Sequence, residues 1–285
     1  MTLRLDGSVG EGGGQIVRTA LTLSLVTGVA FEIDRVRAKR KRPGLARQHL
    51  TAIEAAAEIG QAEVSGARLR STRFRFAPEG LCPGEYRFDV GTAGSATLVA
   101  QTIIPALLAA DGPAEVVVRG GTHNPFAPPF GFFEQVYLPA LRRLGGEVSA
   151  RLARHGFFPA GGGEIRIAVA PSELRPATWL DRGRIQRRAA RATVANLPRH
   201  VAERELAVVA KRLGWKKSEM EIEAAAADGP GNVLELRVEA SGGAELATGF
   251  GAAGLPAERV AERACRELSR YVKAKVPVGE HLADQ

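Results

Sequence analysis

The sequence contains very little cysteine, since only Cys82 and Cys265 carry a thiol among its 285 residues. Two thiols so far apart cannot define a disulfide framework or a cysteine-based metal cluster, which favours the reducing cytoplasm. No basic and apolar leader precedes Leu3, so we also expect no secretion signal. Long apolar runs are missing as well, because none approaches the roughly 18 residues that a membrane span needs. We therefore expect a cytoplasmic protein without membrane contact.

Lysine is scarce too, with 7 residues against 32 arginines in a chain of formal net charge +8. A GC-rich genome produces such a bias as readily as a function does. Guanidinium groups nevertheless suit bidentate recognition of phosphate better than ammonium groups do. The positions of the arginines must therefore decide between genome bias and phosphate binding. The remaining composition is globular, 45% hydrophobic and 25% charged, and the length suits two domains or one large one.

An internal repeat organises the first part of the chain, where residues 59–69 return, with one gap, as residues 144–152. Both copies follow the same succession of apolar patterns. That succession comprises a glycine-rich turn into a helix (15–26 and 96–110), a strand (31–36 and 114–119), a second helix (49–59 and 130–144) and a final strand (73–76 and 164–169). The repeated unit is therefore βαβαββ, and we predict a duplicated α+β architecture.

The pattern changes after Pro171. An arginine cluster comes first, which we interpret as a solvated strand face or a domain junction, with RNA contact as the alternative; its members are Arg182, Arg184, Arg187, Arg188 and Arg191. New elements follow, namely strands near 192–195, 220–224, 233–239 and 245–250, and helices near 199–213 and 256–273. We predict a large repeat domain over residues 1–180 plus 277–285, with an incomplete third repeat, and a smaller inserted α+β domain over 181–276.

A glycine-rich turn over residues 6–15 leads into the first helix, with Arg18 one turn inside it. Exposed backbone N–H groups and the helix dipole favour phosphate at such a turn. The turn lacks the G-K-[ST] of a P-loop and the acidic partner of a dinucleotide fingerprint, so a tight turn without ligand is the alternative. Glu11 inside the turn favours a phosphate bridged by a metal ion, because a bare carboxylate would repel the anion.

Two further segments carry candidate chemistry. Seven basic residues and no acid occur between Arg35 and Glu54, a positive field that suits phosphates or a nucleic-acid end unless it is only a solvated face. The proline and aromatic loop over 120–130 is suited to contact with a base, or to a packed corner. Its His123 is either a ligand, a base or a structural side chain. His155 and His200 show no partner, and no Ser-His-Asp grouping or zinc spacing is present.

Seven ordered motifs together resemble the RNA 3'-terminal phosphate cyclases, and the resemblance is collinear over the whole chain. The motifs are LDGSVGEGGGQIVRTALTLSLVTG (5–28), RPGLARQHLTA (42–52), GTAGSATLVAQTIIPALL (91–108), GGTHNPFAPPF (120–130), HGFFPAGGG (155–163), PRHVAERE (198–205) and EHLADQ (280–285). The resemblance implies repeats similar to the C-terminal domain of translation initiation factor three, interrupted by a smaller inserted domain.

The resemblance also implies a reaction in three displacements at phosphorus. ATP adenylylates a histidine, AMP passes to the RNA 3'-phosphate, and the vicinal 2'-hydroxyl displaces AMP to leave a 2',3'-cyclic phosphate. The implied partners are RNA 3'-phosphate ends, ATP and a divalent cation, Mg²⁺ or Mn²⁺. The need for a 2'-hydroxyl explains why RNA and not DNA is cyclised. The sequence leaves open whether the protein forms a homodimer.

Site residues follow from the resemblance position by position. Glu11 matches the metal-associated acid, and the phosphate and RNA-end site corresponds to Arg18, Arg37, Arg40, Gln48 and His49. Gln101 matches an ATP-binding glutamine, and Pro128 matches a proline packed on one face of adenine. The pentapeptide His281, Leu282, Ala283, Asp284 and Gln285 matches an ATP-binding segment, with the His281 ring on the other adenine face and Asp284 as a polar contact.

We do not interpret His281 as the adenylylated histidine. The resemblance places that residue about two dozen positions beyond the pentapeptide, past Gln285, so we expect the given chain to be truncated. Two other classes of function remain as alternatives. One is a non-catalytic RNA-binding or ribosome-assembly protein on the same fold, against which Gln101 and the HLADQ run argue. The other is a phosphate-handling enzyme on a related fold that does not bind ATP.

Overall fold

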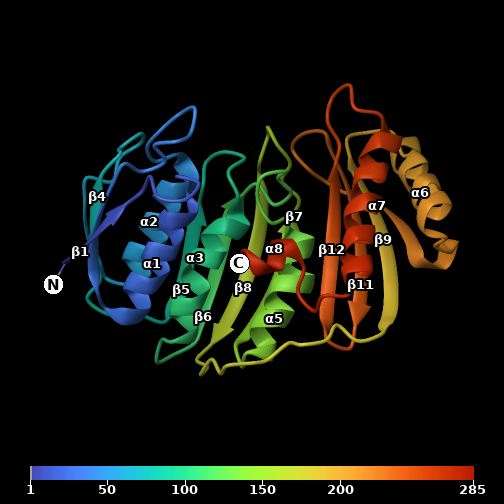
Figure 1. Ribbon diagram of the computed structural model, residues 1–285. Coiled ribbons are helices and arrows are strands. Elements are labelled where there is room, and N and C mark those ends of the chain that lie inside the picture. Colours follow the sequence, from blue (N-terminus) through green and yellow to red (C-terminus); the bar gives the residue numbers. More distant parts are fainter. Residues whose placement is uncertain (1) are drawn as a thin grey trace. The chain divides into compact units, whose positions relative to one another are not determined.

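The computed structural model describes residues 2–285 (Figure 1). Its first fourteen elements are β1 (Thr2–Asp6), α1 (Gln15–Thr27), β2 (Ala30–Asp34), α2 (Arg47–Ile59), β3 (Glu63–Ser65), β4 (Phe74–Ala77), β5 (Gly84–Asp89), α3 (Ala96–Leu108), β6 (Ala114–Gly120), α4 (Phe130–Phe132), η1 (Phe133–Tyr137), α5 (Leu138–Arg143), β7 (Glu147–Arg154) and β8 (Gly163–Ala170). The remaining elements are β9 (Ile185–Ala195), α6 (His200–Leu213), η2 (Lys217–Glu219), β10 (Met220–Ala224), β11 (Gly231–Ala240), β12 (Gly243–Phe250), α7 (Ala257–Ala274) and α8 (Glu280–Ala283).

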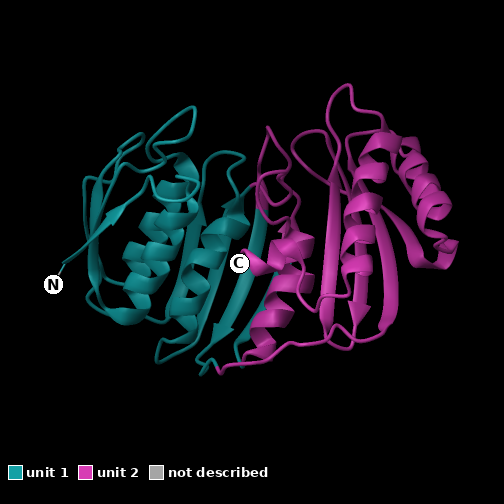
Figure 2. Ribbon diagram, in the orientation of Figure 1, with its two compact units in different colours: residues 1–120, 145–151, 164–174 teal, residues 121–144, 152–163, 175–285 magenta. Residues whose placement is uncertain are grey.

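The chain divides into two compact units (Figure 2). Unit 1 holds the described residues up to Gly120 together with Gly145–Arg151 and Glu164–Leu174. Unit 2 holds Gly121–Leu144, Leu152–Gly163 and Arg175–Gln285. The predicted inserted domain, 181–276, falls within unit 2, and its boundaries stay a prediction.

The predicted repeat is confirmed by two four-stranded sheets of the same topology. Their strand orders are β1-β2-β4-β3 and β5-β6-β8-β7. In each sheet the first two strands are parallel, as a βαβ crossover requires. In unit 1 the helices α1, α2 and α3 contact one another, and the fully buried rings of Phe31, Phe74 and Phe76 lie on β2 and β4. The α+β repeat therefore carries its own hydrophobic core.

The helix expected over 130–144 is present but irregular. It comprises α4, the π-helical turn η1 and α5, with Pro139 near the start of α5. Proline has no N–H, so the carbonyl of Gln135 cannot receive its α-helical hydrogen bond. A wider π turn at this place accommodates the break.

The third four-stranded sheet lies in unit 2 and has the strand order β10-β9-β11-β12, and α6 and α7 pack against its core. Strand β9 begins at Ile185, not near 192 as the sequence predicted. The early residues of β9 are arginines that pair with acids near β10: Arg188 with Glu219 at 3.2 Å, and Arg191 with Glu221. These ion pairs support the interpretation of this part of the arginine cluster as a solvated strand face. Arg182 differs, because it is buried and donates to the carbonyls of Tyr271 and Val272.

Within residues 2–285, no helix is both long enough and apolar enough to cross a membrane.

Candidate functional site

The glycine-rich turn between β1 and α1 lies directly against basic side chains of unit 1. Gly10 and Gly12 adopt left-handed φ values of 61° and 56°, which glycine tolerates best. A Cβ added at Gly13 would stand 2.7 Å from Nη2 of Arg40, and one at Gly14 would overlap Nε2 of His49. The glycines therefore allow a guanidinium and an imidazole to approach the turn.

The basic segment that follows β2 folds back onto this turn. Lys39 donates from Nζ to the Gly10 carbonyl at 2.8 Å, and Arg40 pairs through Nη2 with Oε2 of Glu11 at 3.1 Å. Arg37 itself has a left-handed φ of 53° and donates from Nη1 to the Gly44 carbonyl at 2.7 Å. The segment is thus a fixed loop whose cations meet at the glycine turn.

His49 is buried at the first turn of α2. Its Nδ1 accepts the backbone N–H of Ala46 at 3.1 Å. Burial, with Arg37 and Arg18 nearby, lowers the pKa of His49 to about 3, so the ring is neutral. A neutral ring whose Nδ1 is an acceptor carries its proton on Nε2, and Nε2 is the atom that faces Gly14. His49 therefore presents a neutral N–H donor at the turn.

Arg18 and Arg37 keep a positive charge beside this donor. Burial lowers the pKa of Arg18 to about 10, which still leaves it protonated at neutral pH. Burial and the neighbouring Arg40 lower the pKa of Arg37. Among residues 2–285, no carboxylate forms an ion pair with either side chain. Several cations against one acid, Glu11, produce a site that attracts anions.

Gln48 and Gln101 connect this region to α3. Gln48 accepts the N–H of Ser95 through Oε1 at 3.2 Å, and Ser95 caps α3 by accepting the N–H of Leu98 at 3.2 Å. The Gln101 amide is buried, and neither its nitrogen nor its oxygen has a hydrogen-bond partner among the described residues. An unpaired buried amide is costly, which is the condition expected of a group that pairs with a ligand.

A cavity of about 380 Å³ within unit 2 collects the other predicted residues. The proline-rich loop Pro125 to Pro129 lines it together with Phe132 and Phe250. His281, Asp284 and Gln285 of the C-terminal segment line it too. Pro128 and His281, predicted to contact opposite faces of one base, therefore border the same cavity.

The other two pentapeptide residues lie differently. Leu282 packs against the cluster of Phe132, Val136 and Leu246, and so anchors α8. Ala283 does not line the cavity. His281 is held by a 3.0 Å contact from Nε2 to Oε1 of Glu267, which raises the pKa of His281. Its ring meets Phe132 edge to face, with centroids 6.4 Å apart.

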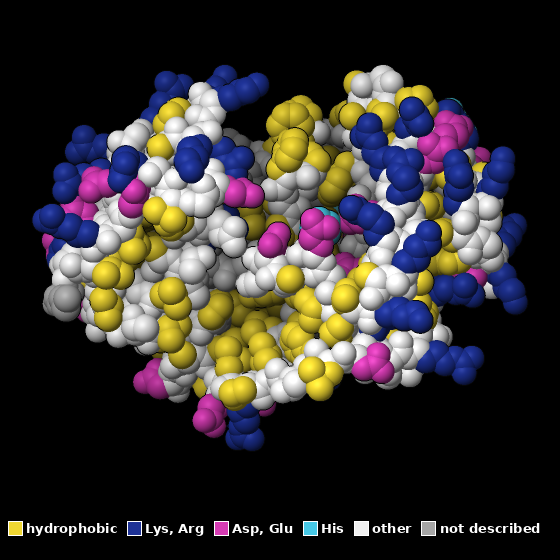
Figure 3. All heavy atoms as spheres, viewed as in Figure 1, with side chains coloured by type: hydrophobic (Ala, Val, Ile, Leu, Met, Phe, Trp, Pro, Cys, Tyr) yellow, Lys and Arg dark blue, Asp and Glu magenta, His cyan; other side chains and the backbone are white. Residues whose placement is uncertain are grey.

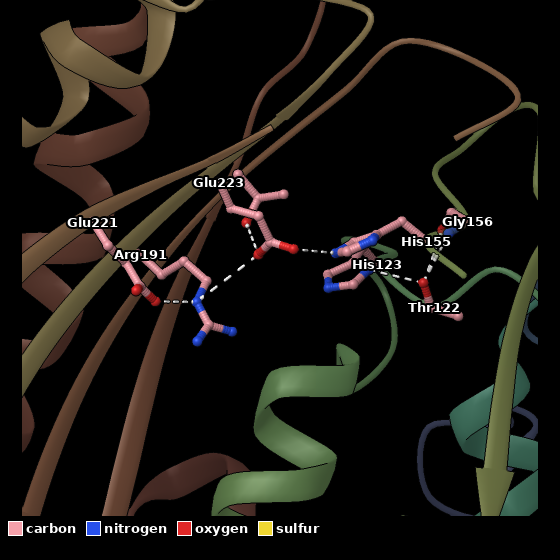
Figure 4. A network of polar contacts seen from close by, with 8 residues as sticks. Thr122, His123, His155, Gly156, Arg191, Glu221 and Glu223 are labelled. Atoms are coloured by element: carbon pink, nitrogen blue, oxygen red, sulfur yellow. Dashed lines mark hydrogen bonds and ion pairs between the residues drawn. The ribbon is translucent and has the colours of Figure 1, made fainter. Parts of the chain in front are cut away.

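A polar network beneath the proline-rich loop fixes that loop in place (Figure 4). Oγ1 of Thr122 accepts the N–H of Gly156 at 2.9 Å and lies 2.8 Å from Nδ1 of His123. The His123 ring stacks on His155 at 5.1 Å, and Nε2 of His155 lies 3.5 Å from Oε1 of Glu223. Burial lowers the pKa of His123 to about 3, so its ring is neutral, and its contacts with Thr122 and His155 are those expected of the structural alternative.

Sequence reasoning missed the partners of His155. This histidine stacks on Phe157 of its own motif and on His123, which belongs to a motif more than 30 residues away. Only the shared glycine-rich and aromatic character of the two motifs, 120–130 and 155–163, hinted that they meet. The backbone holds the two motifs together, because the N–H groups of Thr122 and His123 donate to the Gly156 carbonyl at 2.9 and 3.1 Å.

The described residues contain no group of three or more His, Cys, Asp or Glu side chains placed to hold a metal ion. Between β1 and α1, over residues 7–14, Glu11 is the single acid, and its side chain is 87% exposed. One exposed carboxylate is what a Mg²⁺ ion uses when most of its other ligands are water and substrate phosphates. The residues present therefore fit a metal that arrives with a nucleotide.

Comparison with known proteins gives one consistent result. A family model described as "RNA 3'-terminal phosphate cyclase" matches residues 9–285. A curated protein of Ectopseudomonas mendocina named RNA 3'-terminal phosphate cyclase is 49% identical over 284 residues, 99% of this chain and 83% of the relative. Two further relatives have the same name. The protein of Koribacter versatilis is 49% identical over 99% of this chain and 80% of the relative. The protein of Salmonella agona is 46% identical over 99% of this chain and 82% of the relative.

Proposed function

Because the chain belongs to the RNA 3'-terminal phosphate cyclase family, we propose specific roles for its residues in that family's reaction. The reaction is the ATP-dependent conversion of an RNA 3'-terminal phosphate to a 2',3'-cyclic phosphodiester. The observation that carries the assignment of roles is the convergence of Arg18, Arg37, Arg40 and His49 on the glycine turn. The alternative of a non-catalytic RNA-binding protein finds no relative among those compared above.

The arginines of unit 1 bind phosphate oxygens. Arg18 and Arg37 have no carboxylate partner among residues 2–285, so their charge is available to a substrate anion. Arg40 has one contact, with Glu11 at 3.1 Å, and is half exposed, so a phosphate can replace that contact. Fixed cations of this kind stabilise the charge that develops when phosphorus is attacked.

His49 donates a hydrogen bond from Nε2 to a phosphate oxygen. Its neutral state is favourable here, because a ring with a pKa of about 3 keeps the same charge and the same donor as the pH varies between 5 and 9. Gln48 orients the opening of the site through its bond to Ser95. Both are positioned by α2, whose N-terminus also favours an anion.

The cavity of unit 2 binds the adenine of ATP. Pro128 and the His281 ring supply flat surfaces for stacking, and Phe132 and Phe250 supply the apolar wall. Asp284 and Gln285 offer polar groups for the base edge or the ribose. We propose that the unpaired Gln101 amide is a further contact to ATP, because pairing would remove the cost of burying it.

Glu11 would hold the divalent cation, Mg²⁺ or Mn²⁺, together with nucleotide phosphates. When bound, such an ion neutralises phosphate charge and so favours attack at phosphorus. Glu11 would then contact the metal in place of Arg40, and the Arg40 guanidinium would become available to a phosphate.

The reaction proceeds through three balanced displacements. A histidine nitrogen attacks the α-phosphorus of ATP and pyrophosphate leaves, an oxygen of the RNA 3'-phosphate attacks the histidine-bound AMP and the histidine leaves, and the 2'-oxygen attacks the 3'-phosphorus and AMP leaves. We do not assign the adenylylated histidine to a residue of 2–285. Among these residues, His49 and His123 are buried and hydrogen bonded at Nδ1, and His281 is bonded to Glu267.

Labelled ATP tests this proposal. The protein made from the complete reading frame, incubated with ATP labelled at the α-phosphate, is expected to form a covalent AMP adduct that acid cleaves and base does not. Arg18→Gln and Arg40→Gln are expected to bind ATP less tightly. Absence of the adduct in the unaltered protein would contradict the histidine intermediate.

We also propose a cytoplasmic location, which agrees with Cys82 and Cys265 both being free thiols.

A further inference from the structure

Four cationic side chains form a row on the outer face of α7. Arg263, Arg266, Arg270 and Lys273 follow one another at intervals of three, four and three residues, a spacing that keeps them on one side of a helix. All four are exposed. Figure 3 shows Lys and Arg side chains along the surface where Figure 1 places α7. We call this set the α7 basic row.

The charge of the α7 basic row is not compensated. Among residues 2–285, no carboxylate forms an ion pair with any of its members. The acids of the same helix are engaged elsewhere: Glu262 pairs with Arg212 at 3.0 Å and with Arg259 at 3.3 Å, and Glu267 contacts His281 at 3.0 Å. Unpaired cations so close together repel one another, and an anion bound along the row removes that repulsion.

The row borders a groove that is large enough for a polymer. The groove runs beside α6 and α7, has a volume of about 730 Å³, and is lined by the whole α7 basic row together with Arg212 and Ser269. Ten residues of helix separate Arg263 from Lys273, a rise of about 15 Å. A nucleic-acid strand with a rise of about 3.4 Å per nucleotide places roughly four phosphates along that length.

A membrane is a poor occupant of this surface. The apolar side of α7 is already buried in the core of unit 2 through Val260, Ala264 and Leu268. An interfacial helix needs a free apolar face to enter the lipid, and α7 has none left. The groove instead offers charge along a line, which suits the backbone of a single strand.

Glu267 links the groove to the nucleotide cavity. It lines the groove and also the cavity that holds Pro128 and His281. A strand lying along the α7 basic row therefore runs past the site proposed for adenosine. In the adenylylated intermediate the terminal nucleotide is joined to AMP by two phosphates only, so the rest of the RNA must pass close to that site.

We propose that the α7 basic row binds the sugar-phosphate backbone of the RNA upstream of its 3'-phosphate. The inference rests on the proposed function, since it assumes that RNA is the substrate. If the proposal is right, α7 makes the protein bind longer RNAs more tightly. It does so without recognising their sequence, because contacts to phosphate carry no base information.

Binding measurements with two matched variants test the proposal. The first variant is Arg263→Gln/Arg266→Gln/Arg270→Gln, and the control is Arg188→Gln/Arg199→Gln/Arg204→Gln, which removes the same charge from three exposed arginines that already have acidic partners. The probes are an unstructured 20-nucleotide RNA and a trinucleotide, both with a 3'-phosphate. Fluorescence polarisation gives Kd over a range of salt concentrations.

We expect the first variant to bind the 20-nucleotide RNA at least tenfold more weakly at 0.1 M salt, and its plot of log Kd against log salt to lose a slope of about 2. The trinucleotide should bind unchanged, and the control should resemble the unaltered protein. Equal losses in both variants, or an unchanged Kd for the long RNA, would overturn the inference. Cyclisation of the trinucleotide by the unaltered protein from the complete reading frame tests the proposed function separately.

Discussion

At the scale of single residues, the central feature is a neutral histidine placed among arginines. The N–H of Ala46 holds Nδ1 of His49, so the proton must be on Nε2, which faces the glycine turn. The arginines Arg18 and Arg37 lower the pKa of His49 further and prevent it from competing with them for the anion. At neutral pH the arginines therefore supply the positive charge, and the neutral His49 ring supplies a hydrogen-bond donor of fixed orientation.

Gly14→Ala tests this arrangement. Gly14 has ordinary helical φ and ψ values of −83° and −11°, so alanine causes no backbone strain, but its Cβ would displace His49. We expect cyclisation by the variant to fall about 100-fold, while chemical denaturation shows a folded protein that is less stable by about 1–3 kcal/mol, because the new Cβ overpacks against the buried ring. The control is Gly10→Ala, where φ is 61° and no atom lies within 4 Å of the new Cβ.

Gly10→Ala should lose stability but keep its cyclisation activity. It costs about 1 kcal/mol of stability because alanine is strained at that φ, and it retains His49 in place. If Gly14→Ala kept full activity, the position of His49 would not matter to the reaction.

His281 gives a second prediction at this scale. A base stacked on an aromatic ring gains about 1–3 kcal/mol, so His281→Ala should weaken ATP binding about 5- to 100-fold. His281→Phe should restore much of the affinity, because it keeps the ring and loses only the contact with Glu267. Thermal-shift titration with ATP measures both. Equal affinity in the alanine variant would remove His281 from the adenine site.

At the scale of elements, most helices and strands could be predicted from the apolar period, and the exceptions have local causes. The interval 130–144 reads as one helix because its apolar residues keep helical spacing, yet Pro139 divides it with a π turn. The first half of β9 could not be predicted, since Gln186, Arg187 and Arg188 break any apolar alternation, and its residues form a strand by pairing with β11, about 50 positions further along the chain. Such pairing depends on contacts between segments distant in the sequence.

The same limit applies to the candidate site. The resemblance indicated Pro128 and His281, and the cavity brings them together. Only the similar composition of their two motifs hinted that His155 meets His123, and nothing in the sequence indicated that Gln48 bonds to the turn of the second repeat at Ser95. These contacts join residues more than 30 positions apart, where local patterns carry no information.

Arg182 anchors the end of α7 and gives a prediction about that element. Its buried Nη1 donates to the carbonyls of Tyr271 and Val272 at 3.1 and 3.0 Å, which would otherwise lack partners at the helix end. Arg182→Ala should lower the free energy of unfolding by about 2–4 kcal/mol. Arg184→Ala, at an exposed neighbour, should change it by less than about 0.5 kcal/mol. Urea denaturation measures both, and a similar small change at Arg182 would contradict the anchor.

Glu205 on α6 makes stability depend on pH. The carboxyl is fully buried, Oε2 accepts from Nδ2 of Asn232 at 3.0 Å, and burial raises the pKa of Glu205 to about 7. Between the unfolded pKa, about 4.5, and 7, the folded protein keeps a proton that the unfolded chain has lost. The free energy of unfolding should therefore fall as the pH rises through this window.

Glu205→Gln should reduce that fall, because the amide resembles the protonated carboxyl in shape and charge. Urea denaturation at pH 5 and pH 8 measures the difference, which we expect to shrink by about 1–3 kcal/mol in the variant. Glu203→Gln, at an exposed position of the same helix, is the control. An identical pH dependence in the Glu205 variant and the unaltered protein would show that Glu205 does not titrate in this window.

At the scale of the whole molecule, the excess of arginine over acid has separate uses in the two units. In unit 1 it serves a compact site at the glycine turn, and in unit 2 it pairs with acids on β10 and leaves the α7 basic row unpaired. A genome bias toward arginine explains neither pattern, because it does not choose which arginines lack partners. The duplicated βαβαββ unit supplies the frame for the first site and a smaller α+β region supplies the second.

The most direct test of the central claim compares two substrates that differ by one oxygen. The protein from the complete reading frame is given ATP and an RNA ending in a 3'-phosphate, or the same RNA with a 2'-deoxy terminal sugar. We predict a 2',3'-cyclic phosphate from the first, formed only with ATP, and accumulation of the RNA joined through its 3'-phosphate to AMP from the second. Cyclic product without ATP, or no cyclic product from the ribose substrate, would contradict the account.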